Sequence, residues 1–229
     1  MMSQKHLIIF DWDGTLMDSV GRIVSSMQAT AKALELPVPL ATDVQHIIGL
    51  SLAPAIEQLF GGLAEPQLRQ FIRRYSDEYV TFNQTPTPLF NGIEVMLDSL
   101  RKHHLLAVAT GKARRGLNRV LAETSLHTHF VATRTADETA GKPDPLMLQQ
   151  LINEAQTSAA RTIMVGDSIY DMEMAKNAGV TAIGVSYGVH SHAQLLAAGA
   201  STVVDSPAAL HHYLETVLPQ SPEDLSHVS

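Results

Sequence analysis

The sequence predicts an α/β fold in which helices cover both faces of a parallel sheet. Short runs that are apolar at every position recur along the chain, and amphipathic stretches separate them. A strand that is apolar on both sides is typical of a parallel sheet covered by helices, because neither set of side chains meets water. A long helical stretch without any strand-like run also indicates an all-α insertion after the first strand.

Six short apolar runs, many of them rich in β-branched residues, are the candidate strands. In chain order they are Leu7–Phe10, Leu105–Ala109, Phe130–Ala132, Thr162–Val165, Thr181–Val185 and Thr202–Val204. The stretches between them show helical spacing, as at Ile93, Met96, Leu97 and Leu100. Gly179 follows another such stretch, at the position where helices commonly end. Strands and helices therefore alternate from about residue 86 to 217.

Residues 17–85 interrupt this alternation with three helix-like stretches and no strand-like run between them. We expect them to form a small all-α cap domain above one edge of the sheet. Residues 1–16 and 86–218 then form the core domain, and the proline-containing segment 84–88 is the return linker. The polar tail, residues 219–229, is expected to be disordered.

Composition excludes several classes of protein. The chain has 229 residues, with 16 basic and 23 acidic side chains and a formal net charge of −7, and it has no basic block. This balance argues against nucleic-acid and anionic-membrane partners. The absence of cysteine excludes disulfides, thiolate zinc sites and cysteine nucleophiles. No signal-like or membrane-spanning apolar run is present, so we expect a cytoplasmic protein. We separately expect a monomer or homodimer.

Functional groups are expected at the carboxyl ends of the strands, where open α/β sheets bind their ligands. Asp11 and Asp13 directly follow the first candidate strand, and residues two apart in extended chain point to the same side. Gly14 then permits a sharp turn. Taken alone, this motif is explained equally well by a strand-ending turn in which aspartate and glycine satisfy backbone groups.

Two further motifs carry a hydroxyl and an ammonium. Thr110 and Gly111 end the second candidate strand, where the hydroxyl and the following N–H groups could bind an anionic oxygen or simply cap a helix. Lys142 precedes Pro143, which disfavours helical backbone, so Lys142 is expected in an extended loop within reach of the strand ends. For a lone lysine, an exposed surface position is the plainer explanation.

Asp167 and Asp171 follow the fourth candidate strand and open a helix. Carboxylates at a strand end suit Mg²⁺, although a helix cap with a first-turn acid explains them equally simply. These simple structural explanations account for each motif alone but not for all four motifs together. Like charges about 4 Å apart repel by roughly 4 kcal/mol at an effective dielectric near 20, and Lys142 alone cannot neutralise four carboxylates. The residues therefore predict a Mg²⁺ site with a nucleophilic carboxylate and a pocket for a phosphate-sized anion.

This ordered set of motifs resembles the haloacid dehalogenase superfamily, and most of all its phosphoglycolate phosphatase-like branch, in which a helical cap follows the first motif. The motifs are Asp11-x-Asp13-Gly14-Thr15, Thr110-Gly111, Lys142-Pro143 and Gly166-Asp167-Ser168-x-x-Asp171. The resemblance implies a Rossmann-like core of three layers, α/β/α, and a mobile cap over residues 17–85. It also implies a Mg²⁺-dependent phosphatase whose partner is a small phosphorylated metabolite.

The resemblance also implies a role for each motif. Asp11 would be the nucleophile that forms an aspartyl-phosphate, and Asp13 would be the general acid and base. The implied phosphate-binding residues are Asp11, Thr110, Gly111 and Lys142. The implied Mg²⁺ ligands are Asp11, the backbone carbonyl of Asp13 and Asp167, with Asp171 close by, directly or through water.

Other reactions stay open to different degrees. Within the superfamily, dehalogenases and phosphonatases usually lack the second aspartate, so Asp13 disfavours both. Sugar-phosphate mutases keep both aspartates and are the main alternative. A receiver-like signalling protein is a remote alternative, because the length, the helical insertion and Asp13 all argue against it.

Substrate choice is expected to lie in the cap, where the sequence is least informative. Gly49, Leu50 and Ser51 lie between two cap helices and form either a specificity loop or a plain turn. The cap arginines 69, 73 and 74 fall opposite an apolar helix face, so we expect them in solvent. The 11 histidines have no metal-ligand spacing and are interpreted as surface residues.

Overall fold

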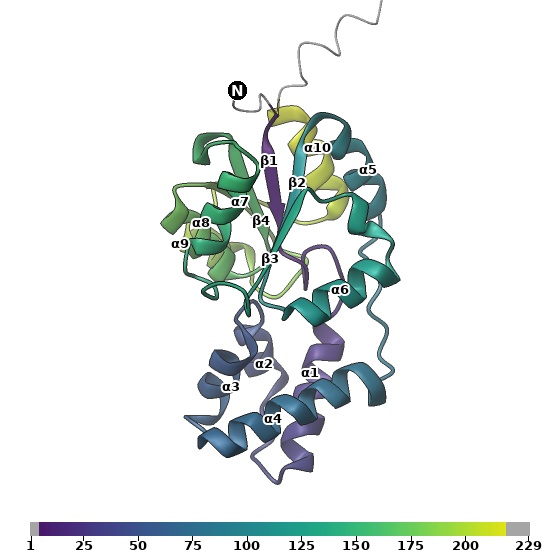
Figure 1. The fold of residues 1–229 in the computed structure, drawn as a ribbon, viewed down its shortest axis with the longest axis vertical. Coiled ribbons are helices and arrows are strands. Elements are labelled where there is room, and N and C mark those ends of the chain that lie inside the picture. The colour runs from purple at the N-terminus through teal and green to yellow at the C-terminus, as the bar shows by residue number, and fades with distance from the viewer. Residues whose placement is uncertain (1–4, 219–229) are drawn as a thin grey trace, which may run out of the picture.

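The structure is a computed structural model in which residues 5–218 are described. Six parallel strands form one sheet in the order β3-β2-β1-β4-β5-β6 (Figure 1). Their bounds are β1 Leu7–Phe10, β2 Leu105–Thr110, β3 Ala132–Thr135, β4 Thr162–Gly166, β5 Thr181–Val185 and β6 Thr202–Val204. The predicted α/β fold class with a parallel sheet is confirmed.

Helices cover both faces of this sheet. One face carries α5 (Ile93–His103), α6 (Arg114–Glu123) and α10 (Pro207–Val217), and the other carries α7 (Leu146–Glu154), α8 (Ile169–Ala178) and α9 (His192–Ala198). Two short 3₁₀ turns, η2 (Leu126–Thr128) and η3 (Ala159–Arg161), complete the connections. Ile8 and Phe10 of β1 pack in the first layer, whereas Leu7 and Ile9 pack in the second. This division explains why β1 is apolar at every position.

The third strand lies two residues later than the apolar run predicts. Phe130 lies instead just before the strand, where its ring packs against that of Trp12 with centroids 6.3 Å apart. β3 contains the polar residues Thr133 and Arg134, which an edge strand tolerates because one of its sides is open. The apolar run therefore marks the segment that leads into the strand rather than the strand itself.

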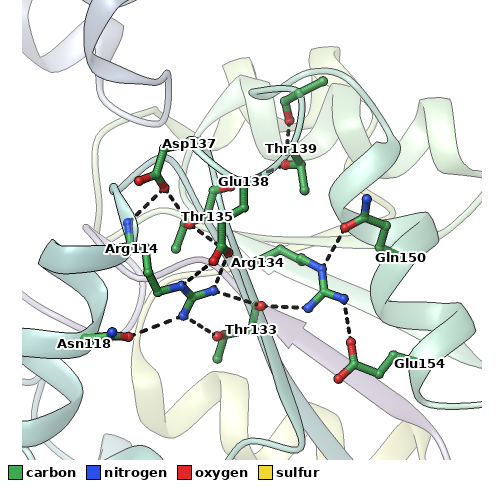
Figure 2. A network of polar contacts seen from close by, with 11 residues as sticks. Arg114, Asn118, Thr133, Arg134, Thr135, Asp137, Glu138, Thr139, Gln150 and Glu154 are labelled. Carbon is green, nitrogen blue, oxygen red and sulfur yellow. Dashed lines mark hydrogen bonds and ion pairs between the residues drawn. The ribbon is translucent and has the colours of Figure 1, made fainter.

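A polar network fixes β3 and the segment that follows it (Figure 2). Arg114 donates to Glu138 at 2.8 Å and to the Thr133 hydroxyl at 2.7 Å. The hydroxyl of Thr135 also donates to Glu138, at 3.0 Å. These hydrogen bonds, with the Arg114 guanidinium first, lower the pKa of Glu138 to about 2. The network ties the chain down four residues before Lys142.

Four α-helices and one π-helical turn form a separate group, which we call the helical unit. They are α1 (Val20–Ala33), α2 (Ala41–Ile47), α3 (Leu52–Phe60), α4 (Glu65–Asp77) and η1 (Glu78–Phe82). The unit has its own apolar cluster around Met27, Ile56 and Phe71. Figure 1 shows the unit beyond the carboxyl ends of the strands. The short α2 was not among the predicted helical stretches, because seven residues give too few turns for a clear period.

The two connections to the helical unit run side by side. The N–H of Asp18 donates to the carbonyl of Pro88 at 2.8 Å, and the N–H of Phe90 donates to the carbonyl of Leu16 at 3.0 Å. This pairing lies near the predicted boundaries at residues 17 and 85, which themselves stay a prediction. The predicted disordered tail, residues 219–229, lies outside the described residues. Within residues 5–218, no helix is long and apolar enough to cross a membrane.

Two histidines depart from the surface positions expected for all of them. His104 and His190 are buried. The His104 ring packs edge-on against His6, with ring centroids 6.0 Å apart. Burial, with the charges of His6, His103 and Lys5 adding to it, lowers the pKa of His104 to about 4. His104 is therefore neutral in the folded protein at neutral pH.

This burial predicts a loss of stability in mild acid. The unfolded chain gains a proton on His104 as the pH falls below about 6.5, whereas the folded protein gains it only near pH 4. Stability due to this group is therefore complete above about pH 6.5 and is lost progressively toward pH 4. His104→Asn should reduce the difference in unfolding free energy between pH 7 and pH 5 by about 1–2 kcal/mol, after allowance for screening by water.

Urea unfolding at the two pH values measures this difference. His212→Asn is the control, since His212 is exposed and its replacement should leave the pH dependence unchanged. Equal pH dependence in wild type and His104→Asn would contradict the assignment.

Candidate active site

Four of the predicted site residues lie together. They come from the carboxyl ends of β1 and β4 and from the loop after β3. Asp11 directly follows β1, and its N–H donates to the carbonyl of Val165 at 2.9 Å. The ammonium nitrogen of Lys142 lies 2.8 Å from Oδ1 of Asp11 and 2.7 Å from Oδ1 of Asp171. The side chain of Lys142 is 0% exposed, so the plainer explanation as a surface lysine is wrong.

Three buried carboxylates form the centre of the site. One oxygen of each of Asp11, Asp167 and Asp171 lies within 4.8 Å of the other two. Asp167 accepts a hydrogen bond from the Thr15 hydroxyl at 2.8 Å and one from the N–H of Val189 at 2.9 Å. These contacts fix the orientation of its carboxylate at the end of β4.

The electrostatics of this centre favour a bound cation. Burial raises the pKa of Asp11 and of Asp167, and the neighbouring carboxylates raise both further. Burial opposes the charge on Lys142, but Asp11 and Asp171 outweigh it and raise the pKa of the ammonium. One ammonium facing three carboxylates leaves excess negative charge out of water. The donors are all hard oxygens, so the residues present fit a metal ion such as Mg²⁺.

Asp171 serves the helix and the site at once. Its Oδ2 accepts from the hydroxyl of Ser168 at 2.6 Å and from the N–H of Ser168 at 3.1 Å. The N–H of Asp171 donates in return to Oγ of Ser168 at 3.3 Å, which completes a capping box at the start of α8. Its Oδ1 pairs with Lys142. The two explanations considered from the sequence, a helix cap and a site residue, are therefore compatible.

Asp13 lies beside the acidic centre with partners of its own. Its Oδ1 accepts from the Ser19 hydroxyl at 2.5 Å and pairs with the Lys112 ammonium at 2.8 Å. Among residues 5–218, no hydrogen bond reaches its Oδ2. Lys112 was not predicted as a site residue, although its place directly after Thr110-Gly111 at a strand end was a usable signal.

Thr110 is the last residue of β2 and is 1% exposed. Its hydroxyl accepts from the N–H of Lys112 at 3.2 Å, and α6 begins only at Arg114, so Thr110 does not cap that helix. Gly111 makes a close approach to the helical unit: a Cβ on it would lie 2.7 Å from the carbonyl oxygens of Gly49 and Leu50. Only glycine leaves room for this contact.

The loop of Gly49, Leu50 and Ser51 lies against three core segments. Besides its contact at Gly111, a Cβ on Gly49 would lie 2.6 Å from Oγ of Ser168, and Gly49 has a φ of +108°. A Cβ on Gly141 would lie 3.0 Å from Oγ of Ser51. The loop therefore touches the segments that follow β2, β3 and β4. Its role as a specificity loop stays a prediction.

The segment after β5 is a further part of the site that the sequence did not reveal. Besides the contact from Val189, the N–H of His190 donates to the carbonyl of Asp167 at 3.2 Å. Nε2 of His190 lies 3.3 Å from Nδ1 of His46 in the helical unit. The segment has no motif of its own, so only the sheet order, which places β5 beside β4, brings it here. Fold and site together define an α/β protein with a buried acidic centre that can hold a metal.

Comparison with known proteins identifies the family. Residues 8–185 match the model of the haloacid dehalogenase-like hydrolases. The probable phosphatase IndB of Dickeya dadantii (strain 3937) is 34% identical over 207 residues, which cover 88% of this chain and 90% of that protein. A phosphoglycolate phosphatase of Agrobacterium fabrum is 32% identical over 210 residues, with 89% and 90% covered. A hydrolase from Pseudomonas syringae has a similar crystal structure, with a TM-score of 0.85 at 24% identity over 94% of this chain and 100% of that one.

The chain belongs to the haloacid dehalogenase-like hydrolase family. The resemblance predicted from the four motifs is confirmed, and the two relatives from Dickeya dadantii and Agrobacterium fabrum, both named as phosphatases, support its phosphatase branch. The Rossmann-like core is confirmed as well, since the parallel sheet and its helical layers agree with the fold of the Pseudomonas syringae hydrolase.

Proposed function

We propose that this phosphatase is a Mg²⁺-dependent phosphomonoester hydrolase that acts on a small phosphorylated metabolite through an aspartyl-phosphate on Asp11. The observation that carries the proposal is the buried Asp11 carboxylate, which Lys142 holds at 2.8 Å among two further carboxylates. The phosphoglycolate phosphatase among the relatives supports a small substrate of this kind. The acidic composition supports an enzyme without nucleic-acid or membrane partners. The proposal also takes the enzyme to be cytoplasmic and either monomeric or homodimeric.

In the first step an oxygen of Asp11 attacks phosphorus, and the bond from phosphorus to the ester oxygen breaks. Lys142, the Thr110 hydroxyl and the backbone at Gly111 hold the other phosphoryl oxygens. Asp11, Asp167 and the backbone carbonyl of Asp13 would bind Mg²⁺, which when bound neutralises charge on the phosphoryl group. Oδ1 of Asp171 pairs with Lys142 and its Oδ2 accepts from Ser168, so Asp171 keeps Lys142 in place.

Asp13 transfers the protons in this proposal. It gives one to the leaving alkoxide, then takes one from the water that hydrolyses the aspartyl-phosphate. Ser19 and Lys112 both hold Oδ1, which leaves Oδ2 to carry the proton. Residues 17–85 act as the cap, and the loop of residues 49–51 contacts the substrate.

Asp13→Asn is expected to lower steady-state turnover by about 10²–10⁴-fold, the usual contribution of general acid–base catalysis. With p-nitrophenyl phosphate the leaving group needs no proton, so the first step should survive and only hydrolysis of the intermediate should slow. Rapid mixing should then show a burst approaching one p-nitrophenolate per active site, followed by slow release. Asp18→Asn, an exposed acid in the same segment, is the control. Wild-type turnover by Asp13→Asn would contradict the assigned role.

A substrate panel tests the function itself. Phosphoglycolate, sugar phosphates and nucleoside monophosphates are incubated with Mg²⁺ or with EDTA, and inorganic phosphate is measured. We expect Mg²⁺-dependent phosphate release from at least one ester. Isomer formation without phosphate release would indicate the mutase, and a long-lived aspartyl-phosphate without turnover would indicate the receiver-like protein.

A further inference from the structure

Three cations surround one aromatic ring where the helical unit meets the core. The ring is that of Tyr79 in η1. Its centroid lies 5.7 Å from the guanidinium carbon of Arg22 in α1 and 5.6 Å from that of Arg119 in α6. The ammonium of Lys112 lies 5.2 Å from the same centroid. The cluster therefore draws positive charge from both sides of the junction, beside Asp13.

The anions around this cluster do not balance its charge. Asp13 pairs with Lys112. Within the described residues, the one anion paired with Arg119 is Glu123, at 3.7 Å, and the side chain of Glu123 is 55% exposed. Arg22 donates from Nε to the carbonyl of Thr85, and among residues 5–218 it forms no ion pair. Cation–π attraction to one ring compensates only part of the cost of gathering like charges.

Two buried polar atoms in the same cluster have no hydrogen-bond partner among residues 5–218. They are the hydroxyl of Tyr79, a residue 7% exposed, and Nε of Arg119. Burial raises the pKa of Tyr79, and the charges that act on its hydroxyl are those of Lys112, Asp13, Arg119 and Arg22. The same three cations lie 5.2–5.7 Å from the centre of the Tyr79 ring. Buried groups of this kind nearly always have a hydrogen-bond partner, and a ligand that accepts hydrogen bonds would supply one to both atoms.

We propose that Arg22, Arg119 and the Tyr79 hydroxyl bind a second anionic group of the substrate, a carboxylate remote from the phosphate ester. The inference rests on the proposed function, which places the leaving group of the substrate beside Asp13. The leaving group then lies beside this cluster as well. A carboxylate accepts hydrogen bonds from both guanidinium groups and from the phenol, and it neutralises the excess charge. Because Arg22 belongs to the helical unit and Arg119 to the core, the bound carboxylate also joins the two.

Two pairs of esters matched in size test the proposal. The pairs are phosphoglycolate with 2-hydroxyethyl phosphate, and 3-phosphoglycerate with glycerol 3-phosphate, and only the first member of each carries a carboxylate. In wild type we expect kcat/KM to be at least about tenfold higher for the ester that carries the carboxylate than for its neutral partner, in one pair or both. Arg119→Gln and Arg22→Gln should lower kcat/KM for that carboxylate ester about tenfold and change its neutral partner less than about twofold. Tyr79→Phe should act in the same direction, less strongly.

Controls separate this proposal from the proposed function. Arg69→Gln removes an arginine that pairs with Glu65 on the exposed face of α4 and should change neither ester. Isothermal titration of phosphoglycolate and 3-phosphoglycerate into Asp11→Asn measures binding without turnover. Weaker binding of the preferred carboxylate-bearing ester to the double variant Asp11→Asn/Arg119→Gln than to Asp11→Asn supports the subsite, even if no ester is hydrolysed. No preference for a carboxylate in wild type, or equal losses for charged and neutral esters in the variants, overturns it.

Discussion

Asp11→Asn is expected to abolish phosphate release, with a fall in kcat of at least about 10⁴-fold. The amide keeps the shape of the side chain but cannot act as the oxygen nucleophile that forms the aspartyl-phosphate. The measurement is steady-state phosphate release with Mg²⁺ from the best ester of the panel. A trapping experiment with labelled phosphate should find no aspartyl-phosphate in the variant.

The same substitution should not cost stability, which separates chemistry from folding. Burial raises the pKa of Asp11, so a neutral amide is less costly to bury there than the carboxylate. The amide oxygen can still accept a hydrogen bond from Lys142. The melting temperature without metal should therefore stay equal or rise, whereas Asp18→Asn should change neither stability nor turnover by much. Appreciable turnover by Asp11→Asn would mean that another residue is the nucleophile.

The sequence predicted most of the acidic centre because that centre follows directly from strand positions. Asp11 and Asp167 come immediately after buried apolar runs, and parallel neighbours end at one edge of the sheet. Lys142 belonged to the predicted motifs too, but its burial between two carboxylates depends on where the loop after β3 runs. That loop is fixed by Arg114 and Glu138, whose contacts leave no periodic signal.

The contacts between the helical unit and the core were the least predictable part. In the sequence, Tyr79 continues the helical spacing of Phe71 and Tyr75, which indicates only an inward-facing position. In the structure it lies against Lys112 and Arg119 from another part of the chain. Helical spacing shows that a residue faces inward but not which distant side chains it meets. The same limit explains His190, whose place beside Asp167 follows only from the sheet order.

Lys142→Met should be the most damaging single change to the fold and the site together. The ammonium lies 2.8 Å from Asp11 and 2.7 Å from Asp171, and all three side chains are buried. Removing one member of a buried ionic group leaves uncompensated charge and typically costs about 3–5 kcal/mol. Turnover should fall by at least about 10²-fold as well, because a charge that stabilises the transferring phosphoryl group is lost. Urea unfolding and phosphate release measure the two effects, with Lys32→Met, an exposed lysine, as control.

The double variant Lys142→Met/Asp171→Asn separates these two effects. Removing the charge of Asp171 relieves the repulsion with Asp11 that the single variant creates, so part of the lost unfolding free energy should return. Turnover should not return, since the positive charge facing the phosphoryl group is still absent. Recovery of both would show that Lys142 only neutralises its neighbours. Recovery of neither would show that Asp171 matters chiefly through its capping box with Ser168, which the amide retains only in part. Stability regained without activity is the result expected of a lysine that serves the fold through Asp171 and the reaction through Asp11.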